Sequence, residues 1–190
     1  MAKEIRRVVT GHDARGKSIF IMDGPSPNVR GAGVAGVVST DLWKTYATPA
    51  SNKGNDEGLD GSFRLPPPKG GSVFRVVAYP PDALRFAAMD KANPAAEKAS
   101  GMDAARDKSN PRHRGFHKTD TVDYAIVLSG EIVAMMDEGE TTLKAGDVLI
   151  QRGTNHAWSN RSGKPVRMLY ILIDGKLDPE LAAALGGAHG

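Results

Sequence analysis

The feature that most constrains the fold is a dense series of strand-like segments between Thr121 and Ile173. These segments are DYAIVLSG, EIVAMM, TTLKAGDVLIQ and VRMLYILI, with the turn-forming stretches DEGE and RSGK among them. Turns that recur at such short spacing are typical of an antiparallel sandwich or barrel. Apolar residues occupy both faces of DYAIVL and LYILI, which indicates a core on one side and a second sheet or subunit on the other.

Further strands are expected in the first 81 residues. Residues 4–9 and 17–22 flank the turn-rich GHDARGK and predict a hairpin, and residues 40–47 and 72–79 each predict one more strand. We therefore expect an all-β fold whose N-terminal strands, over residues 1–81, contribute to the same barrel.

Helices are expected at two places. Ala, Lys, Asp and Met dominate residues 82–114, which favours helix or loop over strand. We interpret this segment as a solvated insertion, with a flap over a pocket as the alternative. Residues 175–190 form the tail, in which Asp178 and Pro179 precede ELAAAL and Gly186 follows it, as at the start and end of a short helix. The barrel core then spans residues 115–174 of one domain.

Composition narrows the classes of partner. The 190 residues include no cysteine, so disulfides and cysteine–zinc sites are excluded. The amino end, MAKEIRRVV, lacks the apolar stretch of a signal peptide, and no run reaches the roughly 18 apolar residues of a membrane span. The net charge is +3, but the basic residues are scattered along the chain and no nucleic-acid recognition motif accompanies them. We expect a cytoplasmic protein that binds neither membrane nor nucleic acid.

The first of two chemically informative segments is GFHKTDTVDYAIVLSG, from Gly115 to Gly130. It resembles the first motif of the cupin superfamily, in which a His-x-His pair is followed after three or four residues by Glu, and six residues later by Gly. His117 matches the first His and Asp123 takes the Glu position. Thr119 stands where the second His is usual.

The second segment is GDVLIQRGTNHAWSN, which opens at Gly146. It resembles the second cupin motif. Gln151 sits where Pro is usual, two residues before Gly153, and His156 and Asn160 follow at the motif's spacing. The first gap is one residue shorter than in the common pattern. The order of the two motifs and their all-β surroundings identify the chain as similar to small single-domain cupins.

A shared inner wall would bring three of these side chains together. Alternate strand residues share a face, and after a turn Asp123 can return beside His117, while His156 enters from a later strand. Two imidazoles and one carboxylate are the ligand set of non-haem Fe(II), and they also accept Mn, Ni, Co or Zn. We expect His117, Asp123 and His156 to hold a divalent metal ion and to be catalytic. The alternative is that the histidines are hydrogen-bonded pocket residues.

Neighbouring residues are assigned by strand parity. Trp158 and Asn160 share the parity of His156, Thr119 shares that of His117, and Phe116 is adjacent to it. We expect these four to contact substrate, although a buried Trp is more often a core residue.

The remaining histidines are expected to be bystanders. His113 lies four residues before His117 and is expected to be solvent-exposed, with a substitute ligand as the alternative. His12 falls in a turn and His189 in the tail, so neither is a good candidate.

The stretch from Gly31 to Gly36, GAGVAG, matches the G-x-G-x-x-G fingerprint of dinucleotide-binding folds. That motif works only where a strand runs into it and a helix follows. Strand-like residues follow here, so we expect the glycines to serve tight turns.

The resemblance implies a cupin-type jelly-roll β-barrel with an N-terminal β extension and a few short helices, assembled as a homodimer. It also implies a metal-dependent enzyme that acts on a small oxygenated organic molecule as a dioxygenase, decarboxylase or lyase. Two alternatives stay open at this point. One is a small-molecule-binding cupin without turnover, and the other is a metal-free isomerase or epimerase that uses a His–Asp pair.

Overall fold

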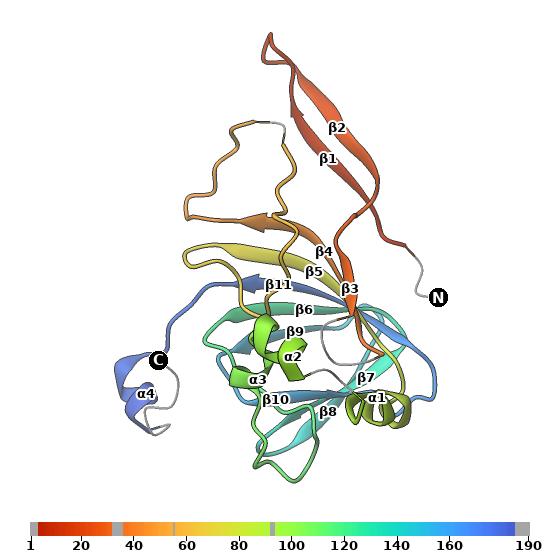
Figure 1. Cartoon of the computed structure of the whole chain (residues 1–190). Helices are drawn as coiled ribbons and strands as arrows, with labels where there is room; N and C mark the ends of the chain where they lie inside the picture. Colours follow the sequence, from red (N-terminus) through yellow and green to blue (C-terminus); the bar gives the residue numbers. More distant parts are fainter. Residues whose placement is uncertain (1–3, 32–35, 55, 92–93, 185–190) are drawn as a thin grey trace.

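Two antiparallel sheets face each other in the computed structural model, which describes residues 4–31, 36–54, 56–91 and 94–184 (Figure 1). The larger sheet has the strand order β3-β4-β5-β11-β6-β9 and the smaller one β10-β7-β8. The strands of the larger sheet are β3 (Val29–Gly31), β4 (Val38–Thr45), β5 (Ser72–Tyr79), β11 (Val166–Ile173), β6 (Val122–Ser129) and β9 (Val148–Arg152). Those of the smaller sheet are β10 (His156–Ser159), β7 (Glu131–Met136) and β8 (Glu140–Lys144).

The core lies between these sheets. Val77 and Met168 enter it from the larger sheet, and Ile132, Ala134 and Trp158 enter it from the smaller one. Alternation along the strands produces this arrangement, since every second residue of β11 is buried. The predicted all-β jelly-roll architecture is confirmed.

The N-terminal strands divide into two groups. β3, β4 and β5 belong to the larger sheet, whereas β1 (Arg6–His12) and β2 (Ser18–Pro25) pair only with each other among the described strands. The predicted hairpin is therefore confirmed, but it projects away from the barrel (Figure 1). Its side chains gain little burial there, and Phe20 is 76% exposed.

Helices occupy much of the insertion, as α1 (Asp82–Met89), α2 (Pro94–Ser100) and α3 (Met102–Ala105). The solvated interpretation is wrong for α1, because Arg85 and Met89 are buried and Phe86 packs against the core. Met102 of α3 also packs against the core. The insertion covers the barrel interior, which agrees with the alternative of a flap.

The predicted C-terminal helix is present as α4 (Pro179–Ala184). Its start is capped as expected, since the Asp178 carboxylate accepts a hydrogen bond from the Glu180 backbone N–H at 2.9 Å. Gly186 lies outside the described residues. Within the described part of the chain, no helix is long and apolar enough to cross a membrane.

The glycine-rich stretch leads into a strand, β4, and not into a helix. Gly36 has a positive φ of 86°, as expected for a tight turn. Residues 32–35 of the fingerprint lie outside the described residues. A dinucleotide pocket of the expected strand–turn–helix type is therefore not formed at Gly36.

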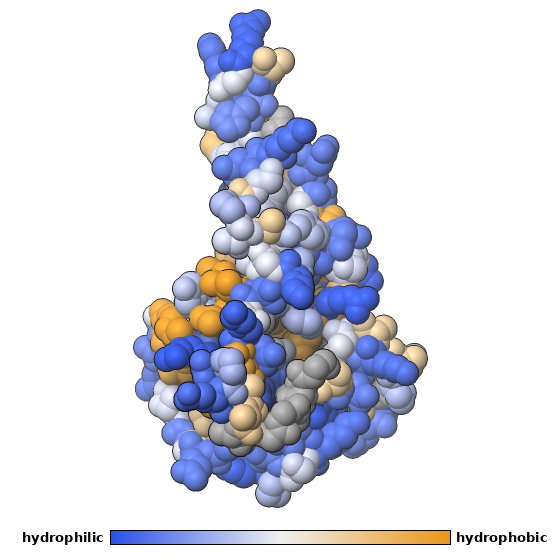
Figure 2. Space-filling view, turned by 90° about the vertical axis from the view of Figure 1, so that its left-hand side faces the viewer, coloured by the Kyte–Doolittle hydropathy of each residue, from blue (hydrophilic) through white to orange (hydrophobic). Residues whose placement is uncertain are grey.

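The outer face of the larger sheet is also apolar, as the sequence predicts. Strand register aligns Phe74, Ile171, Tyr124 and Ile150 in one row across β5, β11, β6 and β9. Phe74, Tyr124 and Ile150 are exposed. A view of one side of the molecule shows hydrophobic residues gathered on the barrel body, whereas the narrow projecting part is mostly hydrophilic (Figure 2).

Gly71 gives a stability prediction for the β4–β5 junction. A Cβ at this position would lie 2.0 Å from the backbone oxygen of Thr45, which paired strands hold in place. We expect Gly71→Ala to lower the free energy of unfolding by about 3 kcal/mol. Urea denaturation measures the loss. Gly24→Ala is the matched control, because nothing lies within 4 Å of its Cβ. An equal effect of the two substitutions would contradict the steric argument.

Candidate functional site

The structure brings His117 and His156 together inside the barrel. Their backbones form an isolated antiparallel bridge, in which each N–H donates to the other residue's carbonyl at 2.9 and 3.0 Å. The two imidazole ring centroids are 4.2 Å apart, with the ring planes tilted by 52°. His156 opens β10 of the smaller sheet, and His117 lies just before β6 of the larger one. The pair therefore sits where the two sheets meet.

Backbone carbonyls determine the tautomer of both rings. Nδ1 of His117 lies 2.9 Å from the carbonyl oxygen of Gly115, and Nδ1 of His156 lies 2.9 Å from that of Thr154. A carbonyl oxygen only accepts hydrogen bonds, so each Nδ1 carries a proton and donates it. Each Nε2 then holds the lone pair. This is the arrangement in which metal-binding imidazoles are oriented by an outer hydrogen bond.

Both imidazoles are neutral at neutral pH. Burial lowers the pKa of His117 to about 4, and the nearby Arg85 and Arg106 add to the effect. Burial, followed by the proximity of His117, lowers the pKa of His156 well below its ordinary value. Two adjacent lone pairs thus remain available to an electrophile over the physiological pH range.

Asp123 lies elsewhere in the barrel interior. It is on β6, opposite Gln151 of β9, and its Oδ2 accepts a hydrogen bond from Gln151 Nε2 at 3.1 Å. Asp123 Oδ1 and Gln151 Oε1 are buried without a hydrogen-bond partner in the described part of the chain. Burial raises the pKa of Asp123 to about 6, against the opposing effect of a Thr121 hydrogen bond.

The three predicted ligands do not form one group in the structure. Within the described ranges, no set of three His, Cys, Asp or Glu side chains is placed to hold a metal ion. The physical reason is that His156 belongs to the smaller sheet, whereas Asp123 belongs to the larger one and is engaged by Gln151. Parity on a strand predicts which face a side chain shares, but not the distance across the barrel.

These pKa values give a pH dependence of stability. The pKa of each histidine is near 6.5 in the unfolded chain; in the folded protein the pKa of His117 is about 4 and that of His156 is well below 6.5. Between these values the unfolded state binds more protons, so stability is lost as pH falls. Asp123 acts in the opposite sense and offsets one proton, because its folded pKa of about 6 exceeds the ordinary 3.8.

The net difference is one proton, so the free energy of unfolding of the metal-free protein is expected to rise by about 1.4 kcal/mol per pH unit between roughly pH 4.5 and 5.5. His156→Asn removes one of the two histidines, so the unfolding free energy of this variant is expected to depend less steeply on pH in this range. Urea titrations at several pH values, compared between the two proteins, measure the difference. Parallel pH profiles of the two proteins would contradict the burial argument.

The side chains of Trp158 and Asn160 are engaged within the protein. Trp158 belongs to the core, and its ring packs edge-on against Tyr170, with a centroid separation of 5.7 Å. The Asn160 side-chain amide donates to the carbonyls of Tyr79 and Lys164 at 3.0 and 2.7 Å. The core alternative weighed for Trp158 therefore holds, and Asn160 fastens the loop that follows β10.

Thr119 and Phe116 are also engaged within the protein. The Thr119 hydroxyl lies 2.7 Å from the hydroxyl of Thr121. Phe116 is fully buried in a small cluster with Val133, Met135 and Ala157. Their predicted substrate contacts have no support in these surroundings.

His113 is not solvent-exposed, so that expectation is wrong. It is 8% exposed, its Nε2 lies 3.3 Å from the Asp82 carboxylate, and its Nδ1 accepts a hydrogen bond from the Gly115 N–H. The ring thus ties α1 to the segment that carries His117. His12 lies at the end of β1, and His189 falls outside the described residues.

A cavity of about 60 Å³ opens beside His117. Sequence reasoning missed the arginines and the tyrosine in its wall. One signal was available, since Arg75 interrupts the apolar strand SVFRVVAY at a position that points inward. The lining residues are Val37, Ser39, Phe63, Leu65, Arg75, Val77, Tyr79, Arg85, Met102, Arg106, Gly115 and His117.

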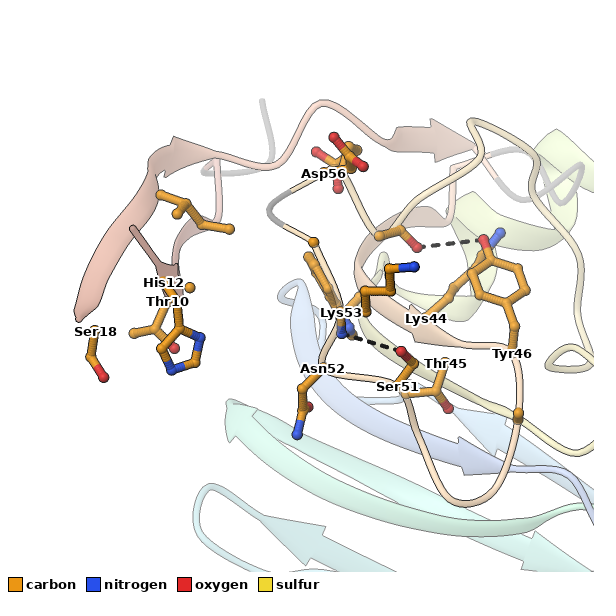
Figure 3. Close-up of a pocket in the computed structure, with 17 residues that line it drawn as sticks. Thr10, His12, Ser18, Lys44, Thr45, Tyr46, Ser51, Asn52, Lys53 and Asp56 are labelled. Carbon is orange, nitrogen blue, oxygen red and sulfur yellow. Dashed lines mark hydrogen bonds between the residues drawn. The ribbon is translucent and has the colours of Figure 1, made fainter. Parts of the chain in front are cut away.

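A larger cavity, of about 560 Å³, lies away from the histidine pair. It is the space between the projecting hairpin and the loop that follows β4, and its labelled side chains come from both (Figure 3). Within it, Tyr46 donates to the Gly58 carbonyl and the Lys53 N–H donates to Ser51. Its wall mixes polar and apolar surface, and its lining residues include neither His117 nor His156.

Comparisons with known proteins agree with the motifs. The family model described as "Cupin domain" matches residues 103–172. Phomopsin biosynthesis cluster protein C' of Diaporthe leptostromiformis is 33% identical over 195 residues, which cover 97% of this chain and 86% of that protein. Cupin-domain-containing oxidoreductase virC of Hypocrea virens is 29% identical, with 90% and 76% covered.

Among solved structures, the cupin domain of Schizosaccharomyces pombe Cnp3 aligns with 97% of this chain and 96% of its own length. The TM-score is 0.44 and the sequence identity 12%. The match of the family model, and the identity to a relative over nearly the whole chain, lead to one conclusion: this chain belongs to the cupin superfamily.

Proposed function

We propose that this cupin is a metal-dependent oxidoreductase, of the dioxygenase type, acting on a small oxygenated organic molecule. The observation that carries the proposal is the adjacent pair of neutral imidazoles, His156 buried and His117 partly buried, each held by a backbone carbonyl so that its Nε2 lone pair is available. Similarity to proteins named cupin-domain-containing oxidoreductases supports the reaction class.

The two adjacent imidazoles are suitable nitrogen donors for a divalent metal. His117 and His156 would be its nitrogen ligands, since imidazole suits Fe, Mn, Ni, Co and Zn. Asp123 Oδ1 and Gln151 Oε1 are buried acceptors without a hydrogen-bond partner in the described chain. These two oxygens are therefore the candidates for a third ligand. When bound, such a metal supplies Lewis-acid chemistry or, if it is iron, oxygen activation.

The protein's own side chains can orient a substrate beside His117. The Tyr79 hydroxyl lies 3.2 Å from that of Tyr170, and burial raises the pKa of both, so both keep their protons at neutral pH. Tyr79 also lines the cavity and can donate its proton in a hydrogen bond to a substrate oxygen. Val37, Leu65 and Val77 form an apolar wall that excludes water and strengthens these polar contacts.

A metal-free epimerase is less well supported. That chemistry needs a His–Asp pair, and His117 directs its Nδ1 to the Gly115 carbonyl and not to Asp123. A non-catalytic binder has one observation in its favour, because Thr119 replaces a usual ligand and its hydroxyl is engaged by Thr121.

Metal reconstitution tests the proposal. The protein is stripped with a chelator, loaded separately with Fe(II), Mn(II), Ni(II), Co(II) or Zn(II), and crystallised for anomalous-scattering maps. We expect one peak, at the Nε2 atoms of His117 and His156, together with metal-dependent oxygen consumption on a panel of small organic acids and alcohols. A loaded protein with no peak at these nitrogens would sink the proposal, whereas saturable binding without turnover would favour the binder.

A further inference from the structure

Positive charge is concentrated at the cavity beside His117. Three guanidinium groups, those of Arg75, Arg85 and Arg106, line about 60 Å³ of space. Two of them are neutralised within the protein: Arg75 pairs with Asp41 at 2.5 Å, and Arg106 pairs with Glu97 at 3.0 Å.

Arg85 has no such partner. It is 6% exposed, and no carboxylate of the described residues lies within 4.0 Å of it. The carboxylate that interacts electrostatically with Arg85 is that of Asp82. Its oxygens are already engaged by His113, Ser159 and the backbone N–H of Asn160. A buried charge without a counter-ion is costly, so its retention calls for an explanation.

The hydrogen bonding of Arg85 is also incomplete. Nη1 donates to the carbonyl of Trp158 at 2.8 Å, which fixes the orientation of the guanidinium. Nε is buried and has no hydrogen-bond partner in the described part of the chain. Tyr79 supports the group from one side, with its ring centroid 5.5 Å from the guanidinium carbon. The site therefore holds a fixed cation with donor capacity to spare, facing a cavity that His117 also lines.

We propose that Arg85 binds the carboxylate of a small organic acid in this cavity, which makes the substrate of the enzyme a carboxylate. The inference rests on the proposed function for its link to catalysis, because it places the anionic end of the substrate beside His117. A guanidinium pairs with a planar carboxylate through two parallel N–H···O bonds, and this pairing supplies both charge and directionality.

The size of the cavity agrees with this ligand class. One water molecule needs roughly 10–15 Å³ of such space, so a volume of about 60 Å³ accommodates a group of a few heavy atoms, such as a carboxylate and its first carbon. The walls contributed by Val37, Leu65 and Met102 are apolar, so a carboxylate there would have few donors other than the cations named. In such surroundings a charged hydrogen bond is stronger than at the surface.

The experiment uses chelator-treated protein, so that anion binding is measured without metal. Acetate and its neutral isostere acetamide are titrated while the Arg85 Nε–H resonance is followed by NMR, with inorganic phosphate as a third probe. We expect acetate to bind saturably and to shift that resonance, acetamide to leave it in place, and phosphate to bind more weakly than acetate.

Two variants complete the test. Arg85→Met removes the charge and is expected to weaken acetate binding by roughly 30-fold or more, measured by calorimetry. Arg114→Met is the matched control, since Arg114 lies outside the cavity, pairs with Asp90 and is half exposed; its acetate affinity is expected to be unchanged. Arg85→Lys keeps the charge and is expected to retain part of the acetate affinity. It therefore tests the proposal even if Arg85→Met folds poorly.

The outcomes separate this inference from the metal proposal. Equal binding of acetate and acetamide, tighter binding of phosphate than of acetate, or full acetate affinity in Arg85→Met would each overturn the carboxylate site. None of these results depends on metal. A protein that binds metal at the histidine pair but fails the acetate tests would therefore leave the proposed function intact and exclude only carboxylates as its substrate class.

Discussion

His156→Ala is expected to lower the affinity for divalent metal by at least about 100-fold, because it removes one of the two adjacent imidazoles proposed as ligands. The loss is expected to reach a similar level for His117→Ala, since the centroids of the two tilted rings lie only 4.2 Å apart. Metal content after dialysis, measured by plasma mass spectrometry, reports the change. Any metal-dependent oxygen consumption should fall in parallel.

The matched control is His12→Ala, a histidine of the projecting hairpin that is remote from the buried pair. Its metal content should equal that of the wild type. Asp123→Asn then addresses the third predicted ligand: a further loss of affinity supports a ligand role for this carboxylate, and an unchanged affinity rejects it. Wild-type metal content in His156→Ala would refute the assignment of the site itself.

Asp41→Ala is expected to lower the free energy of unfolding by about 3–5 kcal/mol. Asp41 and Arg75 are each 3% exposed and form two contacts, at 2.5 and 3.2 Å. Loss of the carboxylate leaves the guanidinium of Arg75 buried without its ion-pair partner. It keeps hydrogen bonds to the backbone carbonyls of Arg64 and Leu65 and its contact with the ring of Phe63. Chemical denaturation at neutral pH measures the loss.

The double variant Asp41→Leu with Arg75→Met tests the origin of that loss. It removes both charges together, and we expect it to recover most of the stability, since apolar replacement of a buried ion pair is often neutral. Asp23→Ala, which breaks the exposed pair with Arg6, is expected to leave the unfolding free energy unchanged. A single variant as stable as the wild type would contradict the buried-charge argument.

The strands of the barrel could be predicted because their signal is local. β6 and β11 alternate buried and partly exposed residues along a β-rich run, and turn residues mark their ends. The motifs likewise indicated that His117 and His156 belong to one site. Each of these features depends on neighbours in the chain, which a sequence displays directly.

Features that depend on contacts between distant segments could not be predicted. Composition suggested a solvated insertion, but Arg85 and Met89 of α1 are buried against strands far away in the sequence. His113 was expected to be exposed, and its partner Asp82 lies 31 residues earlier. The placement of Asp123 relative to the histidine pair could not be predicted for a related reason, since the gap between facing sheets is set by packing and not by strand parity.

The bridge between residues 117 and 156 is made entirely by main-chain atoms, whereas the chemistry proposed there belongs to the side chains. A descendant of this sequence can therefore exchange either imidazole and still close its barrel in the same way. At this position the main chain holds the strands together and the side chains supply the ligands. Single substitutions can therefore change the ligand set while the fold stays the same.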